Sequence, residues 1–185
     1  MMPHWALRLD VAIFYLVNVR LASPQFDVIM PFLTDIDNWR MVIALGLLAL
    51  LIFGGKKGRI ATLLLIVTVT ITDQTSSTLL KPLVERARPC NTLPGVRLLV
   101  DCSGAFSFPS SHATNLFGAA FLLSRFYAAP WPIFFTIATL VAYSRTYVGV
   151  HYPSDVLGGA LLGVLCAWLV TAATRPLVSR LLRRR

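Results

Sequence analysis

VLGGALLGVLCAWLVTAAT, residues 156–174, is the stretch that decides the fold class. Its 19 residues carry no charge, and a helix of that length rises about 28 Å, close to the thickness of the bilayer hydrocarbon. Gly158, Gly159 and Gly163 would let a neighbouring helix approach closely. The stretch therefore predicts a membrane-spanning helix packed against a partner helix.

Four further apolar segments resemble this one, at residues 39–55, 60–80, 111–126 and 131–150. Over the whole chain 56% of residues are hydrophobic and 14% are charged, whereas a soluble domain carries about 25% charge. This composition excludes a disordered chain, a disulfide-dense scaffold and most soluble enzymes. We expect an all-α, integral-membrane helical bundle with about five transmembrane helices, occupying residues 39–174.

Residues 1–38 and 175–185 have a different character. Two prolines, Pro24 and Pro31, break the apolar pattern of the first segment. Charged residues also interrupt it, namely Asp10, Arg20, Asp27, Asp35 and Asp37. This pattern predicts amphipathic helices lying along one membrane face, with a tilted first span as the alternative. The last segment ends in a run of arginines and is expected to be a basic tail.

The positions of the basic residues predict the orientation. The net charge is +9, but the bases stand at the ends of apolar runs, so they indicate a membrane and no nucleic acid. If the loop at 54–59 is cytoplasmic, its bases and those of the carboxyl terminus lie on one side. The positive-inside rule then places the terminus in the cytoplasm. The loop at 81–110 would lie on the outer face, which is the periplasmic face if the membrane is a bacterial inner membrane.

Three sets of polar residues fall on that outer face in this topology. They are Lys81 and Arg88, then Ser110, Ser111 and His112, then Arg145, His151 and Asp155. The three cations favour an anion, and phosphate is the anion of lipid headgroups. Interfacial snorkelling of the long basic side chains is the alternative. The convergence predicts one shared phosphate site.

The histidines suggest what the site does. The string SFPSSHATN, residues 107–115, reads as a helix start, where free N–H groups favour a phosphate. His112 could protonate a leaving oxygen there. His151 and Asp155 are four residues apart, so the carboxylate could fix the imidazole tautomer and leave the other nitrogen as a nucleophile. Simple helix capping and an interfacial His–Asp hydrogen bond are the alternatives.

These strings resemble the type 2 phosphatidic acid phosphatase (PAP2) superfamily, which also includes vanadium haloperoxidases. KPLVERARP (81–89) matches K-x6-R-P, and SRTYVGVHYPSD (144–155) matches S-R-x5-H-x3-D. PSSH (109–112) matches P-S-G-H except that Ser111 replaces glycine. The resemblance implies a metal-independent membrane phosphatase without a cofactor, acting through a phosphohistidine.

The resemblance also implies roles for single residues. His151 would be the nucleophile, His112 the acid and base, and Asp155 the orienting partner. The phosphate would be held by Lys81, Arg88, Ser110, Ser111 and Arg145. Undecaprenyl pyrophosphate is the substrate we expect first, with phosphatidylglycerophosphate and lipid A 1-phosphate as competitors. An anion or lipid transporter and a vanadium-dependent oxidase are alternatives from other classes.

Two smaller predictions concern residues around this site. Cys90 and Cys102 flank the outer loop and would form a disulfide if that face is oxidising. The polar run at 73–78 stands late in an apolar segment, so its side chains are expected to face the bundle interior and to form hydrogen bonds there.

Overall fold

The computed structural model describes residues 3–102 and 104–183, and these form helices and loops without a strand. The all-helical prediction is confirmed. The helices are α1 (His4–Tyr15), the π-helix η1 (Leu16–Arg20), α2 (Pro24–Thr34), the 3₁₀ helix η2 (Ile36–Asn38), α3 (Arg40–Phe53), α4 (Gly55–Asp73), the π-helix η3 (Gln74–Leu80), α5 (Lys81–Val84), α6 (Pro89–Thr92), α7 (Ser111–Phe126), α8 (Trp131–Tyr147) and α9 (Pro153–Arg183).

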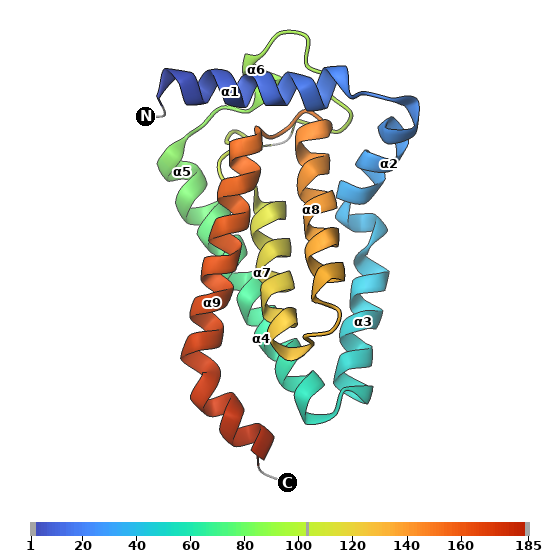
Figure 1. The fold of residues 1–185 in the computed structure, drawn as a ribbon, viewed down its shortest axis with the longest axis vertical. Helices are drawn as coiled ribbons and strands as arrows, with labels where there is room; N and C mark the ends of the chain where they lie inside the picture. Colours follow the sequence, from blue (N-terminus) through green and yellow to red (C-terminus); the bar gives the residue numbers. More distant parts are fainter. Residues whose placement is uncertain (1–2, 103, 184–185) are drawn as a thin grey trace.

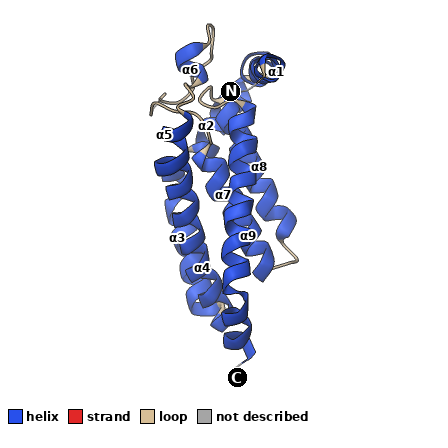
Figure 2. Ribbon diagram, turned by 90° about the vertical axis from the view of Figure 1, so that its left-hand side faces the viewer, coloured by secondary structure: helices blue, strands red, loops and turns tan. Residues whose placement is uncertain are grey.

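Helix α7 lies at the centre of the bundle, where it packs against α9, α8 and α4 (Figures 1 and 2). Its buried residues are mostly small, namely Ala113, Thr114, Gly118, Ala120 and Leu122. Small side chains let the surrounding helices approach closely, which is the usual way that helices associate in a membrane. The bundle is therefore held by close backbone packing around α7.

The glycines of α9 form the closest of these contacts. A Cβ atom added at Gly163 would lie 2.1 Å from the carbonyl oxygen of Thr114, and one added at Gly159 would lie 2.6 Å from that of Ser110. Both oxygens belong to the backbone of the helix start or of α7, so neither can move away alone. The prediction that small residues of this segment admit a partner helix is confirmed for Gly159 and Gly163, whereas a Cβ added at Gly158 would meet the ring of Phe108 in the loop before α7.

Replacing Gly163 by alanine should separate α7 from α9 and lower the free energy of unfolding by about 3 kcal/mol. Thermal unfolding in detergent measures the effect. Gly46→Ala is the matched control, because no atom lies within 4 Å of the Cβ it would add. Equal melting temperatures for the two variants would contradict this account of the packing.

Two helical stretches are long and apolar enough to cross a membrane, Gly55–Val84 and Pro153–Arg183, and Arg40–Phe53 is a shorter apolar helix. Helices α7 and α8 have 16 and 17 residues, so they rise only about 24–26 Å. Large apolar side chains are exposed over the outside of the bundle, among them Leu157, Leu161 and Leu165. The structure thus supports insertion into a membrane, while the count of five spans stays a prediction.

The amino-terminal segment departs in part from the expected arrangement. Helix α1 lies across one end of the bundle, as an interfacial helix would, but α2 descends beside α8 and leads through η2 into α3 (Figure 1). Ser23 caps α2 by accepting from the N–H of Phe26, and Pro24 begins the helix. Met30 and Thr34 are buried, which fixes α2 against the bundle instead of along the membrane face.

The carboxyl-terminal segment also differs from the expected separate tail. Helix α9 continues without a break to Arg183 and contains Pro176. Residues 175–183 are thus the last turns of α9. Arg184 and Arg185 lie outside the described residues.

Candidate active site

The residues singled out in the sequence come from five segments and meet at the end of the bundle that α1 crosses (Figure 1). Lys81 follows the π-helix η3, a kind of helical irregularity that is frequent at functional sites. Electrostatic interactions connect Lys81 with Arg88, Arg145 and His112, and connect His112 with His151. The structure therefore brings these side chains into one site.

His151 lies in the short connection between α8 and α9 and is 1% exposed. The carbonyl oxygen of Arg145 accepts from the backbone N–H groups of Val150 and His151. Gly149 has φ +92°, a conformation that side chains other than glycine's rarely adopt. This turn directs the imidazole between two charged partners: Nε2 is 3.5 Å from Nη1 of Arg88, and Nδ1 is 3.5 Å from Oδ2 of Asp155.

Asp155 is fully buried in the first turn of α9. Its Oδ2 accepts from the backbone N–H of Tyr152 at 2.8 Å, so the carboxylate also caps the helix. Its distance to Nδ1 of His151 exceeds a hydrogen bond, and Nδ1 has no other partner among the described residues. A small rotation of the ring would close that contact.

The three predicted phosphate-binding cations are not neutralised by ion pairs. Within the described ranges, no carboxylate oxygen lies within 4.0 Å of a charged nitrogen of Lys81, Arg88 or Arg145. Arg88 is held by carbonyl oxygens, those of Gly104 at 3.0 Å and Val150 at 3.2 Å. Their positive charge is therefore available to an anion.

The start of α7 supplies the remaining predicted residues. Ser110 stands at the N-cap position without making a side-chain cap, and its buried hydroxyl has no hydrogen-bond partner, so simple capping does not account for it. Its backbone N–H donates to the carbonyl of Asp155 at 3.0 Å, tying α7 to α9. Ser111 Oγ is 3.0 Å from Ser77 Oγ.

Unsatisfied buried groups gather at this end of the molecule. The described chain has five buried side-chain atoms without a hydrogen-bond partner, and three of them are Ser110 Oγ, Arg145 Nε and His151 Nδ1. A buried polar group without a partner costs about 1–3 kcal/mol, and such groups call for a specific explanation. An anion bound beside Ser110 and Arg145 would supply the missing partners.

Two contributors were missed by the sequence reasoning. Arg86 donates from Nη1 to Asp155 Oδ1 at 2.6 Å and from Nη2 to Asp10 Oδ2 at 2.6 Å. Thr34, at the end of α2, accepts from Arg145 Nη1 at 2.6 Å, and its carbonyl is within hydrogen-bonding reach of His112. The sequence signal for Arg86 was its place inside the string 81–89. Thr34 left no signal, because its role depends on how α2 packs.

The smaller predictions have these outcomes. A disulfide joins Cys90 to Cys102 across the outer loop. The polar run faces the bundle interior only in part: Asn115 of α7 donates to Asp73 at 3.1 Å, and Ser77 contacts Ser111. Gln74 and Thr78 are exposed, and the hydroxyl of Thr78 donates to the amide oxygen of Gln74 at 3.0 Å.

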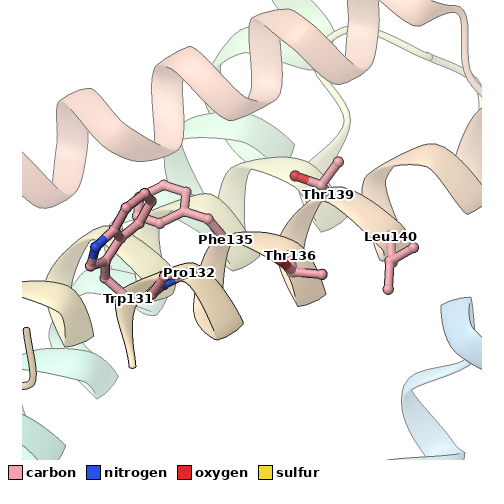
Figure 3. A pocket seen from close by; sticks show the side chains of 6 residues that line it. All are labelled: Trp131, Pro132, Phe135, Thr136, Thr139 and Leu140. Atoms are coloured by element: carbon pink, nitrogen blue, oxygen red, sulfur yellow. The ribbon is translucent and has the colours of Figure 1, made fainter. Parts of the chain in front are cut away.

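A groove of about 370 Å³ lies on the outer face of α8, lined by Trp131, Pro132, Phe135, Thr136, Thr139 and Leu140 (Figure 3). These residues belong to the first part of α8, whereas Arg145 stands in its last turn. The groove is therefore separate from the polar site.

The protonation of His151 gives a prediction for the pH dependence of turnover. Burial, with the positive charges of Arg145 and Arg88 adding to it, lowers the pKa of His151 from 6.5 to about 4. The neutral form, which alone is nucleophilic, then predominates above that value. Because His112 must carry a proton to act as the acid, only the acid limb of the profile reports on His151. As the pH is lowered from 7, we expect no loss of kcat/KM until about pH 5 and a fall near pH 4. A fall of kcat/KM to half its value near pH 6.5, as the pH is lowered, would contradict this prediction.

At this end of the bundle of apolar helices, a His–Asp pair and a second histidine lie beside three cations that have no ion pair among the described residues. The model of the PAP2 superfamily matches residues 61–178, which is most of the chain and contains every site residue predicted above. The chain belongs to the PAP2 superfamily.

Individual relatives agree with this assignment. The lipid A 4'-phosphatase of Bacteroides thetaiotaomicron is 34% identical over 86% of this chain and 74% of its own length. The undecaprenyl-diphosphatase of Sulfolobus acidocaldarius is 30% identical over 86% of this chain and 76% of its own length. The crystal structure of a transmembrane PAP2-type phosphatidylglycerolphosphate phosphatase from Bacillus subtilis superposes with a TM-score of 0.70 at 26% identity, covering 94% of this chain and 88% of that one.

Proposed function

We propose that the chain hydrolyses the phosphate or pyrophosphate of a membrane lipid headgroup through a phosphohistidine formed on His151. The observation that carries the proposal is the setting of that imidazole. It is buried between Asp155 and Arg88, beside cations that form no ion pair with a carboxylate of the described residues. A neutral nucleophile next to a cluster of cations suits attack on a phosphate, because the cations stabilise the negative charge of the transition state.

In this mechanism Nε2 of His151 attacks phosphorus in line with the leaving oxygen. Nδ1 keeps its proton and turns toward Asp155, which stabilises the imidazolium as the N–P bond forms. The equatorial oxygens bind Lys81, Arg88 and Arg145. His112 protonates the lipid oxygen as the P–O bond breaks.

The second half-reaction reverses the proton transfer. His112, now neutral, takes a proton from water, and the hydroxide attacks the phosphohistidine to release inorganic phosphate and free His151. One histidine thus serves as acid and then as base in a single cycle.

Within this class we propose undecaprenyl pyrophosphate as the preferred substrate. Three cations without an ion pair match the charge of a diphosphate better than that of a monoester. Phosphatidylglycerophosphate and the phosphates of lipid A are the competing substrates, and the relatives' names divide among these lipids.

The location of the site is part of the proposal. The first turns of α4, with Lys56, Lys57 and Arg59, and the carboxyl end of α9 lie at the end of the bundle opposite α1 (Figure 1). The positive-inside rule places that end in the cytoplasm. The site would then lie at the periplasmic face, at the depth of the headgroups.

Phosphate release from the three lipids, measured side by side with purified protein in detergent and EDTA, tests the function. We expect release from all three, with kcat/KM highest for undecaprenyl pyrophosphate. A higher kcat/KM for phosphatidylglycerophosphate or a lipid A phosphate would overturn the substrate assignment alone. Binding of all three lipids without release would favour a transporter and overturn the enzyme mechanism.

A further inference from the structure

Arg86 joins the candidate orienting carboxylate to the helix that lies over the bundle end. Its Nη1 donates to Oδ1 of Asp155 and to Oγ of Ser154, and its Nη2 donates to Oδ2 of Asp10, each at 2.6 Å. The guanidinium also lies 4.0 Å from the centre of the Tyr152 ring. With these contacts the planar group is fixed on every side.

Asp10 is as firmly held as its partner. Its side chain is 4% exposed, although it belongs to α1, whose neighbouring Leu7 and Leu9 are exposed. Besides Arg86, it accepts from the backbone N–H of Ser154 at 2.9 Å and from the Ser154 hydroxyl at 2.5 Å. A buried charge is tolerated only when it is paired and hydrogen-bonded, so Asp10 and Arg86 depend on each other.

The carboxylate of Asp155 therefore has two distinct oxygens. Oδ1 is occupied by Arg86, while Oδ2 faces the backbone N–H of Tyr152 and Nδ1 of His151. With Oδ1 bound, the carboxylate cannot rotate to offer a different geometry to the imidazole. We infer that Arg86, held by Asp10, is a positioning residue that aims Asp155 at His151, which rests on the proposed function of that histidine.

Arg86 also balances the charge of Asp155. The other charged or titratable groups that face His151 are Arg88, Arg145 and His112. Without Arg86, the negative charge of Asp155 is offset at the imidazole only by Arg88 and Arg145, so the protonated form is favoured more than in the wild type. Arg86 thus adds to burial and to those two arginines in keeping the nucleophile neutral, besides orienting Asp155.

Arg86→Ala tests this inference with the lipid that the wild-type protein turns over fastest in detergent. Kcat should fall about 10- to 100-fold, the usual cost of losing a group that orients a catalytic side chain, with KM nearly unchanged. The acid limb of kcat/KM should move about 1 pH unit upward. Millimolar guanidinium should restore part of kcat, because it can occupy the vacated space.

Three further variants complete the test. Arg86→Lys should retain more activity than Arg86→Ala, and Asp10→Asn should lower kcat without a further loss in the Arg86→Ala background. Arg40→Ala removes an exposed pair with Asp37 and should leave activity unchanged.

The outcomes separate this inference from the proposed function. Wild-type kcat and an unshifted acid limb in Arg86→Ala would overturn the inference alone, as would an activity loss that guanidinium does not restore. If Arg86→Ala does not fold, kcat and the acid limb of kcat/KM measured for Asp10→Asn and Arg86→Lys test the inference instead. A wild-type protein that releases no phosphate would overturn the proposed function and this role with it.

Discussion

Replacing His151 by alanine should reduce phosphate release about 10⁴-fold or more, because it removes the atom that forms the bond to phosphorus. The cations and Ser110 remain in this variant, so lipid binding should persist with KM changed only a few-fold. Initial rates of phosphate release at saturating lipid, combined with a binding assay on the same protein, measure the two effects separately.

His112→Ala is the informative companion to that variant. Loss of an acid and base costs about 10²–10⁴-fold, so release should be slower but measurable, and both half-reactions should slow. His151→Gln nearly keeps the volume of the buried side chain, so it replaces His151→Ala in the assay if the alanine variant does not fold. Residual activity above 10% in either His151 variant would contradict the nucleophile assignment.

The second large effect is expected at Arg145. Its side chain is partly buried, with Nη1 bound to Thr34 and Nε without a partner among the described residues. Removing an arginine that stabilises a phosphoryl transition state costs about 10³-fold or more. Arg145→Ala should therefore lower kcat/KM by that amount, measured as phosphate release at low lipid concentration.

Arg145→Lys distinguishes charge from geometry. Lysine keeps the positive charge but loses the planar fork that can hold two phosphate oxygens, so an intermediate rate is expected. Arg125→Ala, in the last turn of α7 at the other end of the bundle, should behave as the wild type does. Equal activity of the alanine and wild-type proteins would show that Arg145 does not bind the phosphate.

Much of this architecture could be predicted from the sequence because two physical patterns are local. Apolar runs with few charges predicted the helices, and α7 begins and ends at the residues expected, 111 and 126. The glycines of α9 predicted close helix packing, which Gly163 demonstrates. Most candidate site residues were found because they stand at the end of such a run, and Arg145 because it is a charge within one.

The remaining features depend on how the elements pack. Nothing in the sequence around Asp10 distinguishes a buried carboxylate from a charge on the polar face of an interfacial helix. Its role appears only once α1 lies over Ser154 and Arg86. The path of α2 was mispredicted for the same reason, since the burial of Met30 and Thr34 depends on α8.

Capture of the phosphoenzyme tests the central claim most directly. Wild-type protein is mixed with lipid labelled in the transferred phosphate, quenched in alkali within one turnover, digested and mapped by mass spectrometry. We predict a phosphoryl group on the imidazole of His151, stable in alkali and lost in acid, and its absence from His151→Ala. Label on another residue, or rapid phosphate release with no labelled histidine, would contradict the account.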